Sequence, residues 1–197
     1  GFPLGEEYTL VLAAEGFLKS VKTPGETFVV NLSTSLALEK MAEPYGINVI
    51  YAPVGEINVV QKMLESRALL GGEGNGGVIL KESHLGRDSL TGVTLLLNRM
   101  SQSDQPLSKI FRSLPQFSII KDKISTDGKQ ISSLKDELKK QFHDSRINES
   151  DGIKFTWENS WIHFRKSNTE PILRIYAEAK NDMDAKNLIR KARNTIE

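Results

Sequence analysis

Cysteine is absent from this sequence of 197 residues, and so is any long apolar run. The lack of cysteine excludes thiolate nucleophiles, zinc sites with cysteine ligands and a disulfide framework. No apolar run approaches the roughly 18 residues that span a bilayer, and the N-terminus lacks the basic and apolar regions of a signal peptide. We therefore expect a cytoplasmic protein without a membrane partner.

An excess of one charge sign is also missing. The chain has 26 Lys and Arg residues against 25 Asp and Glu residues, which gives a formal net charge of +1. This balance gives no support for a nucleic-acid partner, although a local basic cluster can still bind a small anion. We expect small molecules or protein as partners.

The sequence lacks an initiator methionine. Its first residue is Gly1, and the first methionine is Met41. We therefore expect the chain to begin inside a longer protein, with further segments upstream. The chain itself has room for one large domain or two smaller ones.

The first half of the chain alternates helical and strand patterns. Apolar residues recur at helical spacing from Glu6 to Val21, and Pro24-Gly25 follows as a helix-ending pair. Further runs predict strands at 27–32, 47–52, 68–70 and 78–81, separated by helical patterns at 36–45, 58–67 and 89–100. This alternation predicts a three-layer α/β domain with a mainly parallel sheet.

The segment Ser101–Pro106 is the predicted domain boundary, because it is short, polar and closed by proline. We expect one domain at residues 1–103 and a second at 104–197. The second half predicts strands at 117–124, 153–157, 161–164 and 172–179, with helices at 133–142 and 182–196 and Asp182 as the N-cap of the last. This order predicts a smaller α+β domain with an antiparallel sheet.

The glycine cluster Gly71–Gly77, GGEGNGG, contains the G-x-G-x-x-G spacing of dinucleotide-binding loops. Such a loop must follow a strand and open a helix, because the free N–H groups at the helix start hold the pyrophosphate. The residues at 78–80 are β-favouring, and no helical period begins there. The sequence therefore argues against a nucleotide site and against an NAD-dependent oxidoreductase.

Two other interpretations of the glycine cluster stay open. It is either a solvent-facing turn in which glycines supply positive φ angles, or a loop in which they let a ligand approach the backbone. In the second case Glu73 and Asn75, two residues apart, point the same way. A carboxylate accepts hydrogen bonds from neighbouring hydroxyls, and an amide both donates and accepts, which is chemistry suited to a sugar.

The loop Arg165–Pro171, RKSNTEP, has the composition of a site for a tetrahedral anion. It offers a guanidinium for a bidentate contact, two hydroxyls and an amide as neutral donors, and a proline that stiffens its exit. The alternative is an ordinary polar hairpin loop. Arg174, in the following strand, is interpreted as structural.

At these two loops the sequence resembles the α-D-phosphohexomutases, a family that includes phosphoglucomutase, phosphomannomutase and phosphoglucosamine mutase. The family has a G-E-x-S-G loop in its third domain and an R-x-S-[GN]-T-E-P loop in its fourth. GEGNGG and RKSNTEP are similar to these loops and come in the same order, and PVGEINVVQKM and GRDSLTGVTLLL also resemble family segments. The resemblance covers the whole chain, as the third and fourth domains.

The resemblance implies a four-domain enzyme that moves a phosphoryl group between the 6 and 1 positions of a hexose phosphate. A phosphoserine donates the group, and a hexose 1,6-bisphosphate is the intermediate. The third-domain loop holds sugar hydroxyls, and the fourth-domain loop holds the phosphate that is not reacting. The implied sugar contacts are Glu73, Asn75 and Glu56, and the implied phosphate contacts are Arg165, Ser167, Asn168 and Thr169.

Two departures from the family pattern bear on the identity of the sugar. Asn75 stands where most members have serine, and the turn at Ser33–Ser35 lacks a lysine that some phosphomannomutases and phosphoglucomutases carry near this point. The acidic Glu56 beside Glu73 suits a substrate with an ammonium group. The two departures leave the choice of sugar open, whereas Glu56 and the general character of the segment favour glucosamine phosphate, with mannose phosphate and glucose phosphate as alternatives.

The family's serine loop and its D-x-D-x-D-R loop for Mg²⁺ do not occur in this sequence, and its three histidines, His84, His143 and His163, have no partner at triad spacing. Phosphoryl transfer needs positioning and a metal ion. We therefore expect this segment alone to be inactive, and the full-length enzyme to bind Mg²⁺ through missing N-terminal domains. The alternative is a complete non-catalytic module that binds sugar phosphates or regulates another protein.

Overall fold

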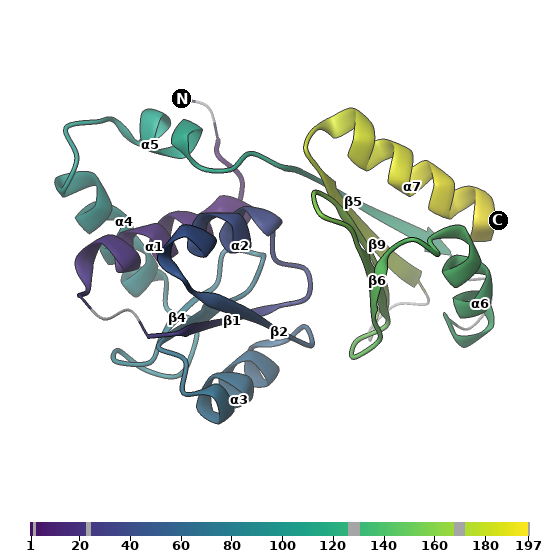
Figure 1. Ribbon diagram of the computed structural model, residues 1–197, viewed down its shortest axis with the longest axis horizontal. Helices are drawn as coiled ribbons and strands as arrows, with labels where there is room; N and C mark the ends of the chain where they lie inside the picture. The colour runs from purple at the N-terminus through teal and green to yellow at the C-terminus, as the bar shows by residue number, and fades with distance from the viewer. Residues whose placement is uncertain (2, 23–24, 126–130, 168–171, 197) are drawn as a thin grey trace. The chain divides into compact units, whose positions relative to one another are not determined.

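The computed structural model describes residues 1–197 except 2, 23–24, 126–130, 168–171 and 197 (Figure 1). The chain divides into two compact units, Gly1–Gln116 and Phe117–Glu197. Each unit has its own sheet, a four-stranded one in the first and a five-stranded one in the second. The two units are described separately below.

The boundary between the units lies after Gln116, not after Ser103 as the sequence predicted. Part of the segment in between forms helix α5 (Leu107–Ser113), which packs on the first unit. The Tyr8 hydroxyl donates to the backbone oxygen of Pro115 at 3.0 Å, and the Tyr8 ring meets a phenylalanine ring of α5 edge-on at a centroid distance of 4.8 Å. The polar, proline-closed segment is therefore a turn within the first unit.

The first unit contains the strands β1 (Thr27–Asn31), β2 (Asn48–Ala52), β3 (Leu70–Gly72) and β4 (Val78–Leu80). They form one sheet in the order β2-β1-β3-β4. Strand β1 is parallel to both β2 and β3, while β4 runs antiparallel to β3. The prediction of a mainly parallel sheet is confirmed.

Helices cover both faces of this sheet, so the three-layer arrangement is also confirmed (Figure 1). Helix α3 packs on one face, and α1, α2 and α4 lie together on the other. Gly16 lets α1 and α4 approach closely, because a side chain there would collide with the backbone of Leu95. The bounds are α1 Glu7–Ser20, α2 Leu36–Ala42 with the 3-10 turn η1 Glu43–Tyr45, α3 Glu56–Ser66 and α4 Ser89–Ser101.

Strand β3 begins two residues later than the strand predicted at 68–70, and it includes Gly71 and Gly72. Both glycines are tightly packed. A Cβ atom at Gly71 would collide with Met63 of α3, and one at Gly72 would collide with Leu10 of α1. Sequence reasoning assigned these glycines to the loop, but the close approach of helices to both faces of the strand requires their small size.

The described residues of the second unit form five strands and two helices. The strands are β5 (Ser118–Ser125), β6 (Arg146–Asn148), β7 (Ile153–Thr156), β8 (Trp161–Lys166) and β9 (Ile172–Ala179), and the helices are α6 (Ile131–Gln141) and α7 (Asp182–Ile196). The sheet order is β5-β9-β8-β7-β6, with every neighbouring pair antiparallel. The predicted α+β domain is confirmed, although the edge strand β6 was not predicted.

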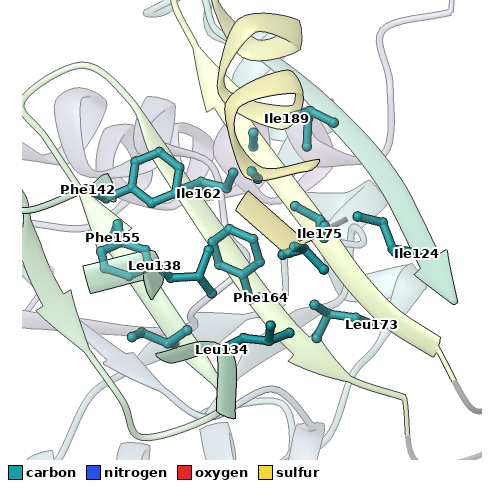
Figure 2. Close-up of a cluster of buried hydrophobic side chains, with 14 residues drawn as sticks. Ile124, Leu134, Leu138, Phe142, Phe155, Ile162, Phe164, Leu173, Ile175 and Ile189 are labelled. Atoms are coloured by element: carbon teal, nitrogen blue, oxygen red, sulfur yellow. The ribbon is translucent and has the colours of Figure 1, made fainter. Parts of the chain in front are cut away.

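The core of the second unit lies between the sheet and its two helices (Figure 2). Alternate residues of β9 point into it, as expected for a strand with one face packed against helices. The aromatic rings of Phe155 and Phe164 meet edge-on, with centroids 6.0 Å apart. The buried cluster includes Leu134, Leu138 and Phe142 from the α6 region, Ile189, Ala192 and Ile196 from α7, and Leu173, Ile175 and Ala177 from β9.

The start of α7 differs in one detail from the prediction. Asn181, not Asp182, caps the helix, because its Oδ1 atom accepts a hydrogen bond from the backbone N–H of Asp184 at 2.9 Å. Asp182 lies inside the first turn and pairs with Lys186, and its carboxylate also accepts a hydrogen bond from the Ser118 hydroxyl of β5 at 2.6 Å. Both contacts lower the pKa of Asp182, and the one with Ser118 ties the start of the helix to the sheet.

Candidate functional site

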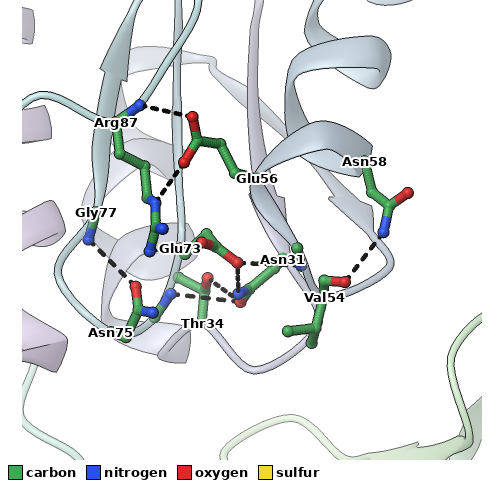
Figure 3. Close-up of polar contacts among 11 residues, drawn as sticks. Asn31, Thr34, Val54, Glu56, Asn58, Glu73, Asn75, Gly77 and Arg87 are labelled. Carbon is green, nitrogen blue, oxygen red and sulfur yellow. Dashed lines mark hydrogen bonds and ion pairs between the residues drawn. The ribbon is translucent and has the colours of Figure 1, made fainter. Parts of the chain in front are cut away.

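The carboxyl ends of β1 and β3 lie next to each other in the first unit. Asn31 ends β1 and Glu73 follows β3, so parallel pairing of the strands brings the two side chains together. The Asn31 amide donates from Nδ2 to Glu73 Oε1 at 3.0 Å. Its Oδ1 atom accepts a hydrogen bond from the backbone N–H of Ser33 at 3.1 Å. It also accepts one from the Thr34 hydroxyl at 3.0 Å (Figure 3). Asn31 therefore anchors both strand ends.

Glu73 is almost fully buried, with only 4% of its surface exposed. Its Oε1 atom also accepts a hydrogen bond from the backbone N–H of Gly55 at 3.1 Å, and its Oε2 atom lies 3.1 Å from Nη1 of Arg87. A buried carboxylate requires such partners, because removal from water without them is costly. An ionised carboxylate has about four acceptor positions. The three contacts of Glu73 leave acceptor capacity on Oε2.

Arg87 lies between two carboxylates and was not identified from the sequence. Its Nε atom donates to Glu56 Oε2 at 2.7 Å and its backbone N–H donates to Glu56 Oε1 at 3.3 Å, while Nη1 reaches Glu73 (Figure 3). The hydrogen bond from the Arg87 side chain lowers the pKa of Glu56, and the same bond raises the pKa of Arg87. The two carboxylates and the guanidinium together carry a charge of −1.

The glycine loop itself is a tight connection between antiparallel strands. The backbone N–H of Glu73 donates to the Gly77 oxygen at 2.9 Å, and that of Gly76 donates to the Glu73 oxygen at 3.1 Å. Gly76 has a φ of 88°, which an L side chain rarely adopts. Strand β4, not a helix, follows the loop, so the nucleotide interpretation is excluded by the fold.

The glycines also provide space for other parts of the same chain. A Cβ atom at Gly77 would collide with the Arg87 side chain, and one at Gly74 would lie 2.5 Å from the Ser33 oxygen. At these two positions, the space that the sequence suggested for a ligand is therefore filled by Arg87 and by the turn after β1. Arg87 lies where it does because residue 77 has no side chain.

Asn75 differs from Glu73 in exposure, although the two are only two residues apart. Asn75 is exposed, and its Oδ1 atom accepts a long hydrogen bond of 3.4 Å from the backbone N–H of Gly77. A surface pocket of about 380 Å³ lies beside this loop, and Glu56, Asn75 and Arg87 are among the residues that line it. The structure thus places Glu56 and Asn75 at one pocket, and it connects them to the buried Glu73 through Arg87.

In the second unit, the predicted phosphate loop begins within β8, because Arg165 and Lys166 are the last two residues of that strand. Arg165 donates from Nε to Asp151 Oδ2 at 2.8 Å, and the buried Ser167 donates its backbone N–H to the Ile172 oxygen at 3.0 Å. Asn168 and Thr169 lie outside the described residues. Where β8 and β9 approach this loop, Arg165 pairs in register with Arg174, and Lys166 pairs with Leu173.

Asp151 was not singled out by sequence reasoning, and it is held in place from two sides. Besides pairing with Arg165, it accepts a hydrogen bond through its backbone oxygen from His163 Nε2 at 2.7 Å. Burial lowers the pKa of His163 to about 4, so the ring is neutral near pH 7. Gly152 follows with a φ of 73°, and a Cβ atom there would collide with the Phe164 oxygen. The turn is therefore fixed against β8.

The two units match two consecutive domains of one family. Residues 5–117 match the family domain described as "Phosphoglucomutase/phosphomannomutase, alpha/beta/alpha domain III", and residues 121–194 match "Phosphoglucomutase/phosphomannomutase, C-terminal domain". The chain belongs to this phosphoglucomutase/phosphomannomutase family. The resemblance inferred from the two loops is therefore confirmed.

Curated members of the family show the same relationship over nearly the whole chain. A phosphoglucomutase/phosphomannomutase of Thermococcus kodakarensis is 32% identical over 90% of this chain and 39% of its own length. A phosphoglucosamine mutase of Methanococcus aeolicus is 30% identical over 94% of this chain and 42% of its own length. This chain thus spans about 40% of the length of these relatives.

Solved structures of family members share the fold. A phosphoglucomutase/phosphomannomutase family protein of Burkholderia thailandensis aligns with a TM-score of 0.79 at 22% identity, covering 99% of this chain and 42% of that protein. The N-acetylphosphoglucosamine mutase of Aspergillus fumigatus in complex with GlcNAc-6P and magnesium aligns with a TM-score of 0.68 at 12% identity, covering 98% of this chain and 47% of that one. At these identities the comparison supports the fold alone.

Within the family fold, the described residues do not form a metal site. No group of three or more His, Cys, Asp or Glu side chains among them has an arrangement that holds a metal ion. Nor does any helix in the described ranges have the length and apolar character required to cross a bilayer. The site consists instead of hydrogen-bonding groups and fixed charges.

Proposed function

We propose that this chain supplies the sugar-binding and phosphate-binding domains of a phosphohexomutase that interconverts hexose 6-phosphate and hexose 1-phosphate through a phosphoserine and a bisphosphate intermediate. The first unit corresponds to the third domain of the enzyme, and the second unit to the fourth. The observation that carries the proposal is the cluster of Glu73, Glu56 and Arg87 at the strand ends, in a chain that belongs to the family.

In this proposal, Glu73 and Asn75 contact sugar hydroxyls. Glu73 accepts a hydroxyl hydrogen bond at the acceptor position left on Oε2, and the exposed amide of Asn75 both donates and accepts. Glu56 belongs to the same site, because it lines the pocket and pairs with the guanidinium that also contacts Glu73. Preorganised groups of this kind orient a polyol without a further ordering cost.

Arg165, Ser167, Asn168 and Thr169 hold the phosphate that is not reacting. Arg165 uses Nε for Asp151, which leaves its two Nη groups for a bidentate contact with phosphate oxygens. Binding energy gained at the remote phosphate orients the sugar for phosphoryl transfer at its other end. The same loop serves both directions of the reaction, because either phosphate of the bisphosphate occupies it in turn.

The serine nucleophile and the Mg²⁺ ligands lie in other domains of the full-length enzyme. The described residues do not fit a Mg²⁺ site, and we assign no step of metal chemistry to them. A solved structure of the A. fumigatus N-acetylphosphoglucosamine mutase is a complex with glucose 1,6-bisphosphate, which supports a hexose 1,6-bisphosphate as the intermediate here. This segment alone is therefore expected to bind hexose phosphates without turning them over.

The favoured substrate is glucosamine phosphate, with mannose phosphate and glucose phosphate as alternatives. Several of the similar curated relatives are named phosphoglucosamine mutases, including those of Methanococcus aeolicus and Methanocaldococcus jannaschii. A hydroxyl-binding cluster of the kind formed by Glu73 and Asn75 contacts groups that all three hexoses share. The discrimination among them therefore has to come from other contacts in the site.

The test is an assay of the full-length protein that contains this segment, with the 1-phosphates of glucosamine, mannose and glucose in parallel. We expect turnover with at least one of them, highest for glucosamine phosphate, and none from the 197-residue chain alone. Full-length protein that binds hexose phosphates without interconverting them would favour the non-catalytic module. Failure to bind any of them would refute both functions.

A further inference from the structure

We propose that Arg87 is a sugar-contacting residue of this site, and that Glu56 acts by orienting Arg87 instead of receiving an ammonium group of the substrate. The inference rests on the proposed function, and it adds a residue that the sequence did not indicate. It also gives Glu56 a role different from the direct contact assigned to it above.

The guanidinium of Arg87 is held at two points. Its Nε atom lies 2.7 Å from Glu56 Oε2 and Nη1 lies 3.1 Å from Glu73 Oε2, while its backbone N–H donates to Glu56 Oε1 at 3.3 Å. A planar guanidinium fixed by two carboxylates has a defined direction, which a lysine ammonium could not reproduce. The side chain therefore presents its remaining donors at a fixed place, although 43% of its surface is exposed.

The remaining donors of Arg87 face a ligand-sized space. A guanidinium has five N–H groups, and the contacts within the described chain engage Nε and Nη1. Arg87 lines the pocket of about 380 Å³ together with Asn75 and Asp88. The free N–H groups therefore require acceptor atoms from a ligand or from water.

Neighbouring hydroxyl groups are the ligand chemistry that fits this arrangement. A hydroxyl donates to the acceptor position left on Glu73 Oε2 and accepts from an Nη group of Arg87, while the adjacent hydroxyl meets the amide of Asn75. A free phosphate fits less well, because Glu56 and Glu73 outweigh the single positive charge of Arg87. The site thus recognises a diol of the sugar ring.

Each carboxylate oxygen of Glu56 accepts a hydrogen bond from Arg87. Both oxygens accept from this residue, one from the backbone N–H and one from Nε, and these bonds lower the pKa of the carboxyl. Glu56 also stands in the first turn of α3, where the helix dipole favours a negative charge. Its negative charge is therefore already paired with the guanidinium of Arg87, which weakens the attraction of Glu56 for a substrate ammonium group.

The glycine loop supports the same role for Arg87. Gly77 lies under the Arg87 side chain, and a Cβ atom there would collide with it. On the other side, a Cβ atom at Gly86 would lie 2.9 Å from His84 Nε2 and 3.3 Å from Glu56 Oε1. The two glycines thus leave space for the paired side chains of Arg87 and Glu56, and this space allows the pair to keep one fixed arrangement.

The experiment measures kcat and KM of the full-length protein for glucose 1-phosphate and glucosamine 1-phosphate in the variants Arg87→Met and Glu56→Gln. Loss of a charge-assisted contact to substrate is expected to raise KM or lower kcat/KM by about 10- to 100-fold in Arg87→Met. Glu56→Gln should lower kcat/KM for both sugars by the same smaller factor. The double variant should resemble Arg87→Met, because the two residues act as one unit.

Two controls separate this effect from loss of folding. Arg99→Met breaks the comparable pair between Arg99 Nε and Glu15 Oε2, at 2.9 Å in the same unit, and should lower stability without changing kcat/KM. Arg87→Lys keeps the charge but cannot bridge both carboxylates, and should recover only part of the activity. Inhibition by inorganic phosphate, which probes the Arg165 loop, should not change in any variant at residue 87.

Each outcome decides a separate point. A selective loss for glucosamine 1-phosphate in Glu56→Gln would assign the ammonium to Glu56 and overturn the inference. Unchanged kcat/KM in Arg87→Met would show that Arg87 has only a structural role. Wild-type protein without mutase activity on any hexose phosphate would refute the proposed function itself, and the inference with it.

Discussion

Arg165 donates from Nε to Oδ2 of Asp151 at 2.8 Å, so the cation assigned to the substrate phosphate already has a carboxylate partner. The pair is partly buried, with 26% of the Arg165 side chain and 21% of the Asp151 side chain exposed. Because Nε is bound to Asp151, the orientation of the guanidinium is fixed, and its Nη groups remain for other acceptors. Asp151 is therefore a positioning residue for the proposed phosphate site.

The first prediction concerns this pair. Asp151→Asn keeps an acceptor but removes the charge, and we expect KM for hexose phosphates to rise roughly fivefold, equivalent to about 1 kcal/mol, with kcat changing less. Asp151→Glu should recover part of the loss if its longer carboxylate reaches Arg165. Steady-state kinetics of the full-length protein checks this. An unchanged KM in Asp151→Asn would show that Arg165 needs no alignment.

The second prediction concerns the buried carboxylate of Glu73. Glu73→Ala leaves Asn31 and Arg87 without their shared partner, and we expect the free energy of unfolding of the first unit to fall by about 3 kcal/mol. Urea unfolding followed by circular dichroism measures it. The matched control is Glu65→Ala, which breaks an exposed pair with Lys62 and should cost less than about 0.5 kcal/mol.

The third prediction concerns pH. The pKa of His163 is lowered from 6.5 to about 4, chiefly by burial, with Lys154 and Arg165 acting in the same direction and Asp151 opposing them. The unfolded state therefore binds a proton first as pH falls. The contribution of the neutral His163 ring to the free energy of unfolding is fully present above about pH 6.5. It is lost as the pH falls toward 4, by about 3 kcal/mol in total.

The measurement for His163 uses the two tryptophans, Trp157 and Trp161, both of which lie in the second unit. Their fluorescence in urea titrations between pH 7 and pH 4 reports the unfolding of that unit. His163→Gln should flatten the decline in this range, whereas the exposed His143→Gln should not. Equal slopes in wild type and His163→Gln would contradict the prediction.

The fourth prediction concerns the space under Arg87. Gly77→Ala forces the Arg87 side chain to move, and we expect kcat/KM for hexose phosphates to fall about tenfold while the unit stays folded. Gly46→Ala is the control, because its φ of 71° is strained for alanine but its Cβ would meet no neighbour. It should cost about 1 kcal/mol of stability and leave the kinetics unchanged.

Hydrophobic periodicity predicted the type of most elements. Helix α1, for example, is observed at Glu7–Ser20 where helical spacing runs from Glu6 to Val21, and β9 is observed at the predicted Ile172–Ala179. The edge strand β6 was missed because three residues are too few to show an alternation. The prediction placed β3 two residues too early because glycine is depleted in strands. Only the packing of Met63 and Leu10 against Gly71 and Gly72 explains why the strand includes these glycines.

The composition and local patterns of this sequence were sufficient to determine its fold class, the two loops that carry its family membership and the absence of a nucleotide cradle. The tertiary structure alone decided that α5 belongs to the first unit, that Arg87 lies between Glu56 and Glu73, and that Asp151 aligns Arg165. These pairs join residues 31 and 14 positions apart in the chain. Periodicity reports which face of an element is buried, whereas contacts of this range depend on how strands pair and helices pack.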